Sequence, residues 1–243
     1  VFDKKTLQTT AVKNKGFVND IDGGPSFWPR YIYNDNTLVD FIYADKLLEH
    51  INEKKVTKPL LLVLGGSSGS KQINDLVCEN LPWLLQHFIV VHQTGMYQGE
   101  NLSSVVIPAE YKNDYKPYNF IYEQMPSVIA CADIILSRAG ANSLWECAAL
   151  LKPMVLIPLC GYATRGDQVD NASYFEKHGI ALTLNGKDAD SEHLKNALTA
   201  MCSLQKREEC AAACKNLLPQ IKPAEKIASL LYNEYVVNIE DIE

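Results

Sequence analysis

The chain has 243 residues, of which 47% are apolar, and its formal net charge is −6. That length suits one large domain or two small ones, and the apolar content is enough for a buried core. No apolar run approaches 18 residues, no block of Lys or Arg exceeds a pair, and the first residues lack a basic region followed by an apolar core, so we expect no membrane span, no nucleic-acid partner and no signal peptide.

Residues 1–58 mix glycine, proline and aromatic residues without a clear period and end in a helical stretch. From Pro59 onward, short apolar runs typical of buried strands alternate with helical segments. The expected strands are 60–65, 88–92, 119–123, 133–137, 154–158 and 180–184, and the expected helices are 70–85, 125–132, 141–151 and 167–179, with two or three more up to Tyr235. This alternation predicts a parallel sheet of βαβ units and a doubly wound, Rossmann-like α/β fold.

We divide the chain into an ill-defined N-terminal segment (1–58), a Rossmann-like domain (59–236) and a tail (237–243). The last helical segment places Ile227, Leu230 and Leu231 on one apolar stripe, which we expect to pack back onto a domain. In doubly wound sheets, ligands bind beyond the carboxyl ends of the strands. The candidate site therefore consists of the loops that follow the strands.

The first expected strand runs directly into the glycine-rich loop GGSSGS, residues 65–70. Glycines let a backbone approach a phosphate closely, and the start of the next helix favours an anion. A serine-capped turn would use the same residues equally well. The loop is neither a P-loop, because no GK[ST] follows, nor GxGxxG, because Gly65 and Gly66 are adjacent.

The second expected strand ends in HQTG (92–95) without the carboxylate that an NAD site requires about 20 residues after its glycines. This disfavours an NAD oxidoreductase. A single histidine at a strand end, here His92, is more often a structural residue than a catalyst.

The fourth expected strand leads into SRAGANSLWE (137–146), and we expect Glu146 in the first turn of the following helix. The helix dipole alone favours a carboxylate there. Alternatively, the carboxylate accepts hydrogen bonds from the two hydroxyls of a ribose, and the small residues before it leave room for a diphosphate.

After the fifth strand, Asp167, Gln168 and Asn171 cluster at a helix start, with Asp167 and Asn171 on one face. These short polar groups suit sugar hydroxyls, although Asp167 also suits an N-cap. Four polar loops at successive strand ends together favour one nucleotide-sugar cleft.

Metal sites are not expected. Cys210 and Cys214 lie four residues apart, but no His or further Cys stands at ligand spacing, and the seven cysteines without CxxC are typical of reduced thiols in a cytoplasmic protein. Two DxD patterns, at 20–22 and 188–190, fall away from the expected strand ends, and we interpret them as solvated turns.

The motifs GGSSGSKQIN, HQTG, FIYEQM, ADIILSRAGANSLWE and RGDQVDNA occur in this order. Over residues 59–235 the chain closely resembles the carboxyl-terminal half of the MurG family of N-acetylglucosaminyltransferases. The resemblance implies a GT-B glycosyltransferase, in which two Rossmann-like domains face a cleft and the carboxyl-terminal one binds the donor UDP-GlcNAc. The donor-binding residues that it implies are Gly66, Ser67, Tyr122, Ala141, Asn142, Ser143, Glu146, Asp167, Gln168 and Asn171.

Within that set, the resemblance gives each residue a role. Ser67 contacts the diphosphate, and the backbone of Tyr122 pairs with uracil. The start of the helix at 141–143 lines the diphosphate and sugar, and Glu146 holds the ribose. Gln168 binds the GlcNAc hydroxyls, with Asn171 supporting the same loop.

The implied reaction is an inverting transfer of GlcNAc, without a bound metal or cofactor, to the muramoyl sugar of a lipid-linked peptidoglycan precursor (lipid I to lipid II). It implies a location in the cytoplasm or peripherally on the cytoplasmic face of the inner membrane. The chain departs from the family at Ala139, where many relatives have Ser, and at Asp167, where they have Gln.

The family's amino-terminal half, with its glycine-rich acceptor loop and histidine, has no counterpart here, and Arg30 is only a weak match to the arginine near the domain junction. We expect the catalytic residues and the acceptor site in that half, and a chain that binds donor but is inactive alone. The alternatives are a UDP-sugar-binding subunit completed by a partner protein and a GT-B-fold sugar-nucleotide epimerase.

Overall fold

The computed structural model describes residues 58–66, 68–95, 107–122, 125–161, 166–218 and 223–233. The strands in these residues are β1 (Leu60–Leu64), β2 (Ile89–Gln93), β3 (Tyr115–Tyr118), β4 (Ile134–Ser137), β5 (Met154–Leu156) and β6 (Ala181–Thr183). They form one parallel sheet in the order β3-β2-β1-β4-β5-β6, with β1 and β4 at its centre. The predicted doubly wound α/β fold is confirmed.

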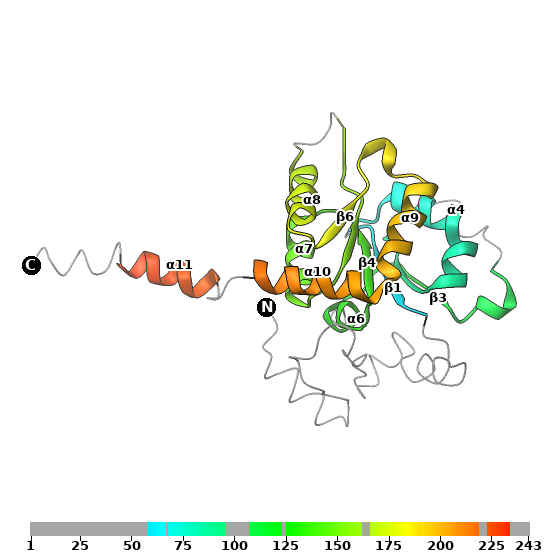
Figure 1. Cartoon of the computed structure of the whole chain (residues 1–243), viewed down its shortest axis with the longest axis horizontal. Coiled ribbons are helices and arrows are strands. Elements are labelled where there is room, and N and C mark those ends of the chain that lie inside the picture. Colours follow the sequence, from blue (N-terminus) through cyan, green and yellow to red (C-terminus); the bar gives the residue numbers. More distant parts are fainter. Residues whose placement is uncertain are drawn as a thin grey trace, which may run out of the picture.

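Helices cover both faces of this sheet (Figure 1). One face carries α4 (Lys71–His87) and α9 (Ser191–Cys202), and the other carries α6 (Met125–Cys131), α7 (Ala141–Ala149) and α8 (Asp167–Lys177). Helix α10 (Leu204–Leu217) contributes side chains to both apolar layers, and short 3-10 turns lie at Ala109–Tyr111 and Gly186–Asp188.

The central strand β1 shows why an apolar run predicts a strand in this sheet. All five residues of β1 are buried. Leu60, Leu62 and Leu64 point into one apolar layer, and Leu61 and Val63 point into the other. A parallel strand covered on both faces needs apolar residues at every position, so it appears in the sequence as an unbroken run.

The predicted strand at 119–123 is wrong. The third strand is instead Tyr115–Tyr118, four residues earlier, at the edge of the sheet. An edge strand tolerates Pro117, which cannot donate to a ladder, and it leaves Lys116 and Pro117 outside the core, so it lacks an apolar run. Ile121, which suggested a strand, is a buried residue of the loop that follows.

The expected packing of the last helix is not seen among the described residues. In α11 (Pro223–Leu231), the stripe formed by Ile227, Leu230 and Leu231 is more than half exposed. Figure 1 shows α11 beyond the end of α10, away from the sheet. Within the described ranges, other helices already cover both faces of the sheet.

No helix in the described ranges is both long enough and apolar enough to cross a membrane. The expected helical stretch before Pro59, Arg30, the DxD pattern at 20–22 and the tail at 237–243 all lie outside the described residues.

The loops after β1 and β2 touch through two glycines. A Cβ on Gly95 would lie 2.3 Å from both Cα and N of Gly69, and a Cβ on Gly69 would lie 2.3 Å from the carbonyl oxygen of Thr94. Both glycines have positive φ, +75° and +83°. Only residues without a side chain allow this backbone contact.

We expect Gly95→Ala to lower the free energy of unfolding by about 2–4 kcal/mol, because the methyl group adds overlap to the strain of a positive φ. Urea denaturation of the full chain measures this. The control is Gly186→Ala, at φ +53° with no atom within 4 Å of the added Cβ, which should lose only about 1 kcal/mol. Equal losses in the two variants would contradict the contact.

Candidate functional site

The candidate site lies where β1 and β4 end side by side at the centre of the sheet. The chain leaves β1 for α4 on one face and leaves β4 for α7 on the opposite face. Loops that diverge in this way open a crevice at the carboxyl edge, which is where doubly wound folds bind ligands.

The glycine-rich loop at 65–70 contains the serine-capped turn and also an exposed glycine of the kind that a phosphate-binding loop needs. Ser70 caps α4, since its Oγ accepts from Ile73 N at 3.3 Å, so the capped turn is present. Gly66, by contrast, is exposed at φ +89°, and a Cβ added to it would meet no atom within 4 Å. Its backbone is therefore open to a ligand. Ser67, the predicted diphosphate contact, lies outside the described residues.

Gln93 connects this loop to the loop after β3. Its Nε2 donates to the carbonyl of Gly66 at 3.3 Å, and its Oε1 accepts from Ile121 N at 2.9 Å. Tyr122, the predicted uracil contact, follows Ile121 and is 73% exposed. The bridge brings two of the predicted contact segments, at Gly66 and Tyr122, to the same edge.

The start of α7 is a second open anion position. Its N-cap is Gly140, no side chain of the described residues caps it, and its first turn contains no acidic residue. Ala141 and Asn142 are exposed and Ser143 is half-buried. Free N–H groups at such a helix end, without a competing carboxylate, favour a phosphate.

The expectation that Glu146 lies in the first turn of this helix is wrong. Because α7 begins at Ala141, Glu146 is the sixth residue and lies in the second turn, exposed. It is four residues from Asn142 and so shares a face with it. The dipole explanation loses force at this depth, since that effect fades beyond the first turn.

At the start of helix α8, no member of the polar cluster of Asp167, Gln168 and Asn171 caps the helix, and the last two bond to neighbouring loops instead. Its N-cap is Gly166, at φ +84°, so Asp167 is the first helical residue and not the cap. Gln168 Oε1 accepts from Leu159 N at 3.0 Å, and Asn171 Nδ2 donates to the carbonyl of Ala139 at 3.0 Å. These bonds tie α8 to the loops after β5 and β4. With Asp167 and Asp170 in its first turn, this helix start suits hydroxyl groups better than an anion.

Sequence reasoning missed Arg138. Its Nη1 donates to Gln72 Oε1 at 2.8 Å on α4, to the carbonyl of Ile157 at 3.0 Å and to that of Pro158 at 3.3 Å. A partly buried cation thus joins the loops after β4 and β5 to the start of α4. The only local signal was its place next to the end of a strand in SRAGA.

His92 is structural, as its position at a strand end suggested. It is fully buried, with Nδ1 3.0 Å from the Tyr115 hydroxyl and Nε2 3.1 Å from Asn74 Oδ1. Burial lowers the pKa of His92 from 6.5 to about 4, because it removes the solvent that would stabilise the charged ring.

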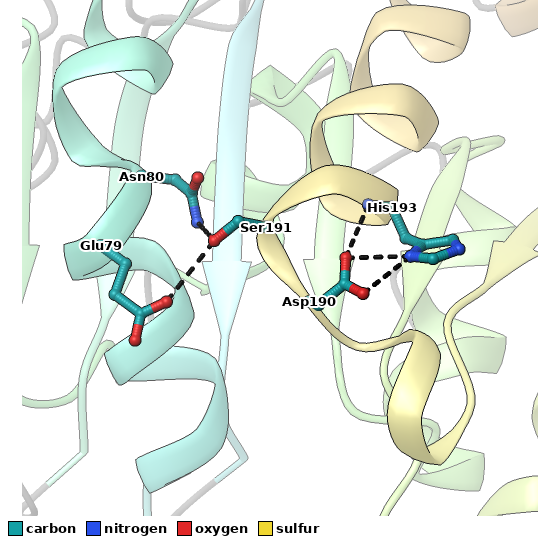
Figure 2. A network of polar contacts seen from close by, with 5 residues as sticks. All are labelled: Glu79, Asn80, Asp190, Ser191 and His193. Carbon is teal, nitrogen blue, oxygen red and sulfur yellow. Dashed lines mark hydrogen bonds and ion pairs between the residues drawn. The ribbon is translucent and has the colours of Figure 1, made fainter.

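The DxD pattern at 188–190 is part of a helix start. Asp190 caps α9, accepting from His193 N at 2.9 Å, and the neighbouring Ser191 hydroxyl accepts from Asn80 Nδ2 at 2.8 Å and donates to Glu79 Oε2 at 3.5 Å (Figure 2). Across the described ranges, no group of three or more His, Cys, Asp or Glu side chains is placed to hold a metal ion.

Comparison with known proteins identifies relatives of this domain. The profile of the glycosyltransferase family 28 C-terminal domain matches residues 60–231. A Treponema denticola protein named UDP-N-acetylglucosamine--N-acetylmuramyl-(pentapeptide) pyrophosphoryl-undecaprenol N-acetylglucosamine transferase is 38% identical over 198 residues, 77% of this chain and 51% of that protein. A Geobacillus thermodenitrificans protein of the same name is 45% identical over 141 residues, 58% of this chain and 38% of the relative.

Solved structures agree with the fold. The crystal structure of Acinetobacter baumannii MurG matches with a TM-score of 0.63 at 26% identity, covering 76% of this chain and 53% of MurG. The calicheamicin glycosyltransferase CalG4 matches in fold alone, with a TM-score of 0.56 at 16% identity over 74% of this chain and 45% of its own. The expected GT-B carboxyl-terminal fold is confirmed, and the chain spans about half the length of the curated relatives it matches.

We expect the buried His92 to make the folded chain less stable as the pH falls. The unfolded chain binds a proton near pH 6.5, whereas the folded chain resists it until about pH 4, so stability is lost as the pH falls through this window. Between pH 7 and 5 the loss is about 2 kcal/mol. Urea denaturation at both pH values should show it in the wild type and not in His92→Gln, whose side chain does not titrate. Parallel pH profiles would contradict it.

Proposed function

The chain belongs to glycosyltransferase family 28, and we propose that it forms the donor-binding half of a peptidoglycan N-acetylglucosaminyltransferase. In this proposal it binds UDP-GlcNAc for transfer of GlcNAc to the muramoyl sugar of a lipid-linked precursor, lipid I, to give lipid II. The names of its relatives support the substrate class. The acceptor binds to an amino-terminal half, which also brings any peripheral contact with the cytoplasmic face of the membrane.

One observation carries the proposal: two helix starts free of carboxylates flank the crevice between β1 and β4. Neither α4 nor α7 has an acidic residue in its first turn, and Arg138 lies between them. Converging N–H dipoles and a partly buried cation suit a diphosphate. Gly66, the start of α7 and Ser67 are its proposed contacts.

The rest of the donor extends from that diphosphate along the same edge. Glu146 accepts hydrogen bonds from the ribose hydroxyls, and the backbone of Tyr122 binds uracil. Asp167 and Gln168 bind the GlcNAc hydroxyls. The bond of Asn171 to the loop before α7 supports this assignment, because it holds the start of α8 next to the start of α7. The bond of Gln168 fixes its side chain against the loop after β5.

The proposed chemistry is a displacement with inversion that uses no metal or cofactor. An acceptor hydroxyl attacks the anomeric carbon, the bond from that carbon to the diphosphate oxygen breaks, and UDP leaves. Negative charge grows on the diphosphate in the transition state, where the helix starts and Arg138 stabilise it. The group that takes the hydroxyl proton belongs to the amino-terminal half in this proposal.

We expect isothermal calorimetry with the full chain to detect UDP and UDP-GlcNAc. Glu146→Ala should weaken UDP binding about 10- to 100-fold, because two hydrogen bonds to a charged group are lost. The control is Glu192→Ala, an exposed glutamate at the start of α9, which should bind UDP like the wild type.

Deoxygenated ligands make this assignment sharper. 2′-Deoxy-UDP should bind the wild type more weakly than UDP does. That difference should vanish in Glu146→Ala, because the variant has no carboxylate to accept a hydrogen bond from the 2′-hydroxyl. A folded wild-type chain without measurable affinity for UDP would refute the proposed function. A deoxy penalty that persists in the variant would refute only the role of Glu146.

A further inference from the structure

A buried hydrogen-bonded network lies directly beneath the glycine-rich loop. It runs from Tyr115 on the edge strand through His92 on β2 to Asn74 on α4, and ends at the carbonyl of Thr94, which Asn74 Nδ2 reaches at 2.9 Å. All four residues are buried, Asn74 to 1% exposure. None of them is among the proposed donor contacts.

The network has a single direction of donation. Asn74 donates from Nδ2 to a carbonyl, so its Oδ1 must accept from His92 Nε2–H. His92 Nδ1 then accepts from the Tyr115 hydroxyl, whose pKa is raised by burial so that it keeps its proton. Each group therefore fixes the tautomer or the amide orientation of the next.

The end point of the network is the surface on which the glycine-rich loop rests. The Thr94 carbonyl is so close to Gly69 that a Cβ on Gly69 would lie only 2.3 Å from its oxygen. The next residue, Gly95, contacts the backbone of Gly69 as well. The N–H of Asn74 makes the ordinary helical bond to the carbonyl of Ser70 at 2.9 Å, so Asn74 is fixed within one turn of the end of the loop. Its side chain holds the backbone of Thr94, on which the loop rests.

We propose that Asn74, oriented by His92 and Tyr115, is a positioning residue that sets the affinity of the glycine-rich loop for the donor diphosphate without contacting the donor. The idea rests on the proposed function for its ligand. Interactions with phosphate depend on backbone N–H groups aimed at fixed points. A loop that shifts by a fraction of an ångström would lose them, whereas the uridine part, bound elsewhere along the edge, would not be affected.

The chain contains a matched control for Asn74. Asn80 lies on the same helix, is 3% exposed, and donates from Nδ2 to the carbonyl of Leu76 and to the Ser191 hydroxyl, both at 2.8 Å (Figure 2). Its bonds lead to α9 and away from the loop. Asn74→Ala and Asn80→Ala therefore remove the same group from similarly buried positions.

The test compares UDP with uridine, which lacks the phosphates, on the full chain. We expect Asn74→Ala to raise the Kd for UDP about tenfold and to leave the Kd for uridine, measured by NMR titration, within twofold of the wild type. Asn80→Ala should leave both within twofold. Equal UDP losses in the two variants, or a parallel loss of uridine binding in Asn74→Ala, would overturn the proposal.

Hydrogen exchange gives a readout that needs no ligand. Backbone amides of residues 65–70 should exchange at least several-fold faster in Asn74→Ala than in the wild type or Asn80→Ala, and an unchanged rate overturns the proposal. If the wild type fails to bind UDP, the proposed function falls and the exchange rates still decide the role of Asn74. Should Asn74→Ala not fold, Tyr115→Phe removes only the hydroxyl that donates to His92. It should raise the same exchange rates several-fold, and wild-type rates in this variant would overturn the proposal.

Discussion

The backbone contact between Gly69 and Gly95 is the constraint on which the candidate site depends. It allows the loop after β1 to rest on the end of β2, so that the glycine-rich segment lies across the sheet edge instead of projecting from it. A side chain at either position would push the loop away. Gln93, one residue before Thr94, then reaches Gly66 and Ile121 from below, and the loops after three strands become one surface.

Charge divides that surface into regions with different chemistry. Every helix that starts at the carboxyl edge presents a partial positive charge of similar size. The first turns of α4 and α7 leave this charge uncompensated, whereas Asp167 and Asp170 offset it at α8. The same structural element therefore favours an anion at the centre of the sheet and neutral hydroxyls beside it. Arg138 strengthens the contrast, since its bonds place its cation at the central crevice.

How much the sequence could predict depends on whether a feature is local. Strands β1, β2, β4 and β5 lie in or beside apolar runs because both faces of the sheet are covered there, and the edge strand β6 stands between the buried Ile180 and Leu184. The helix starts after β4 and β5 follow from glycine and small residues. Strand β3 escaped because an edge strand that contains Pro117 does not need such a run. The role of Arg138 also escaped, since it depends on loops that lie far apart in the sequence and meet only in the folded chain. The exposed stripe of α11 has the amphipathic pattern of a packed helix, and the pattern does not show whether a partner surface is free.

The burial of His92 limits what this domain can contribute to a transfer reaction. A general base must reach the proton that it removes and must have a pKa suited to holding it. His92 lies near the carboxyl edge of the sheet, where the donor is proposed to bind. Both its nitrogens are bonded, however, and its lowered pKa makes it a poor proton acceptor. Glu146 and Asp167 are assigned to donor hydroxyls in the proposal, where a carboxylate acts by accepting hydrogen bonds. Within this scheme the domain lowers the barrier through the leaving group, by holding a diphosphate whose charge increases, and the proton acceptor lies outside the described residues. Donor affinity and proton removal then depend on separate parts of the protein, so that a change at Asn74 or Glu146 acts on the first without altering the second.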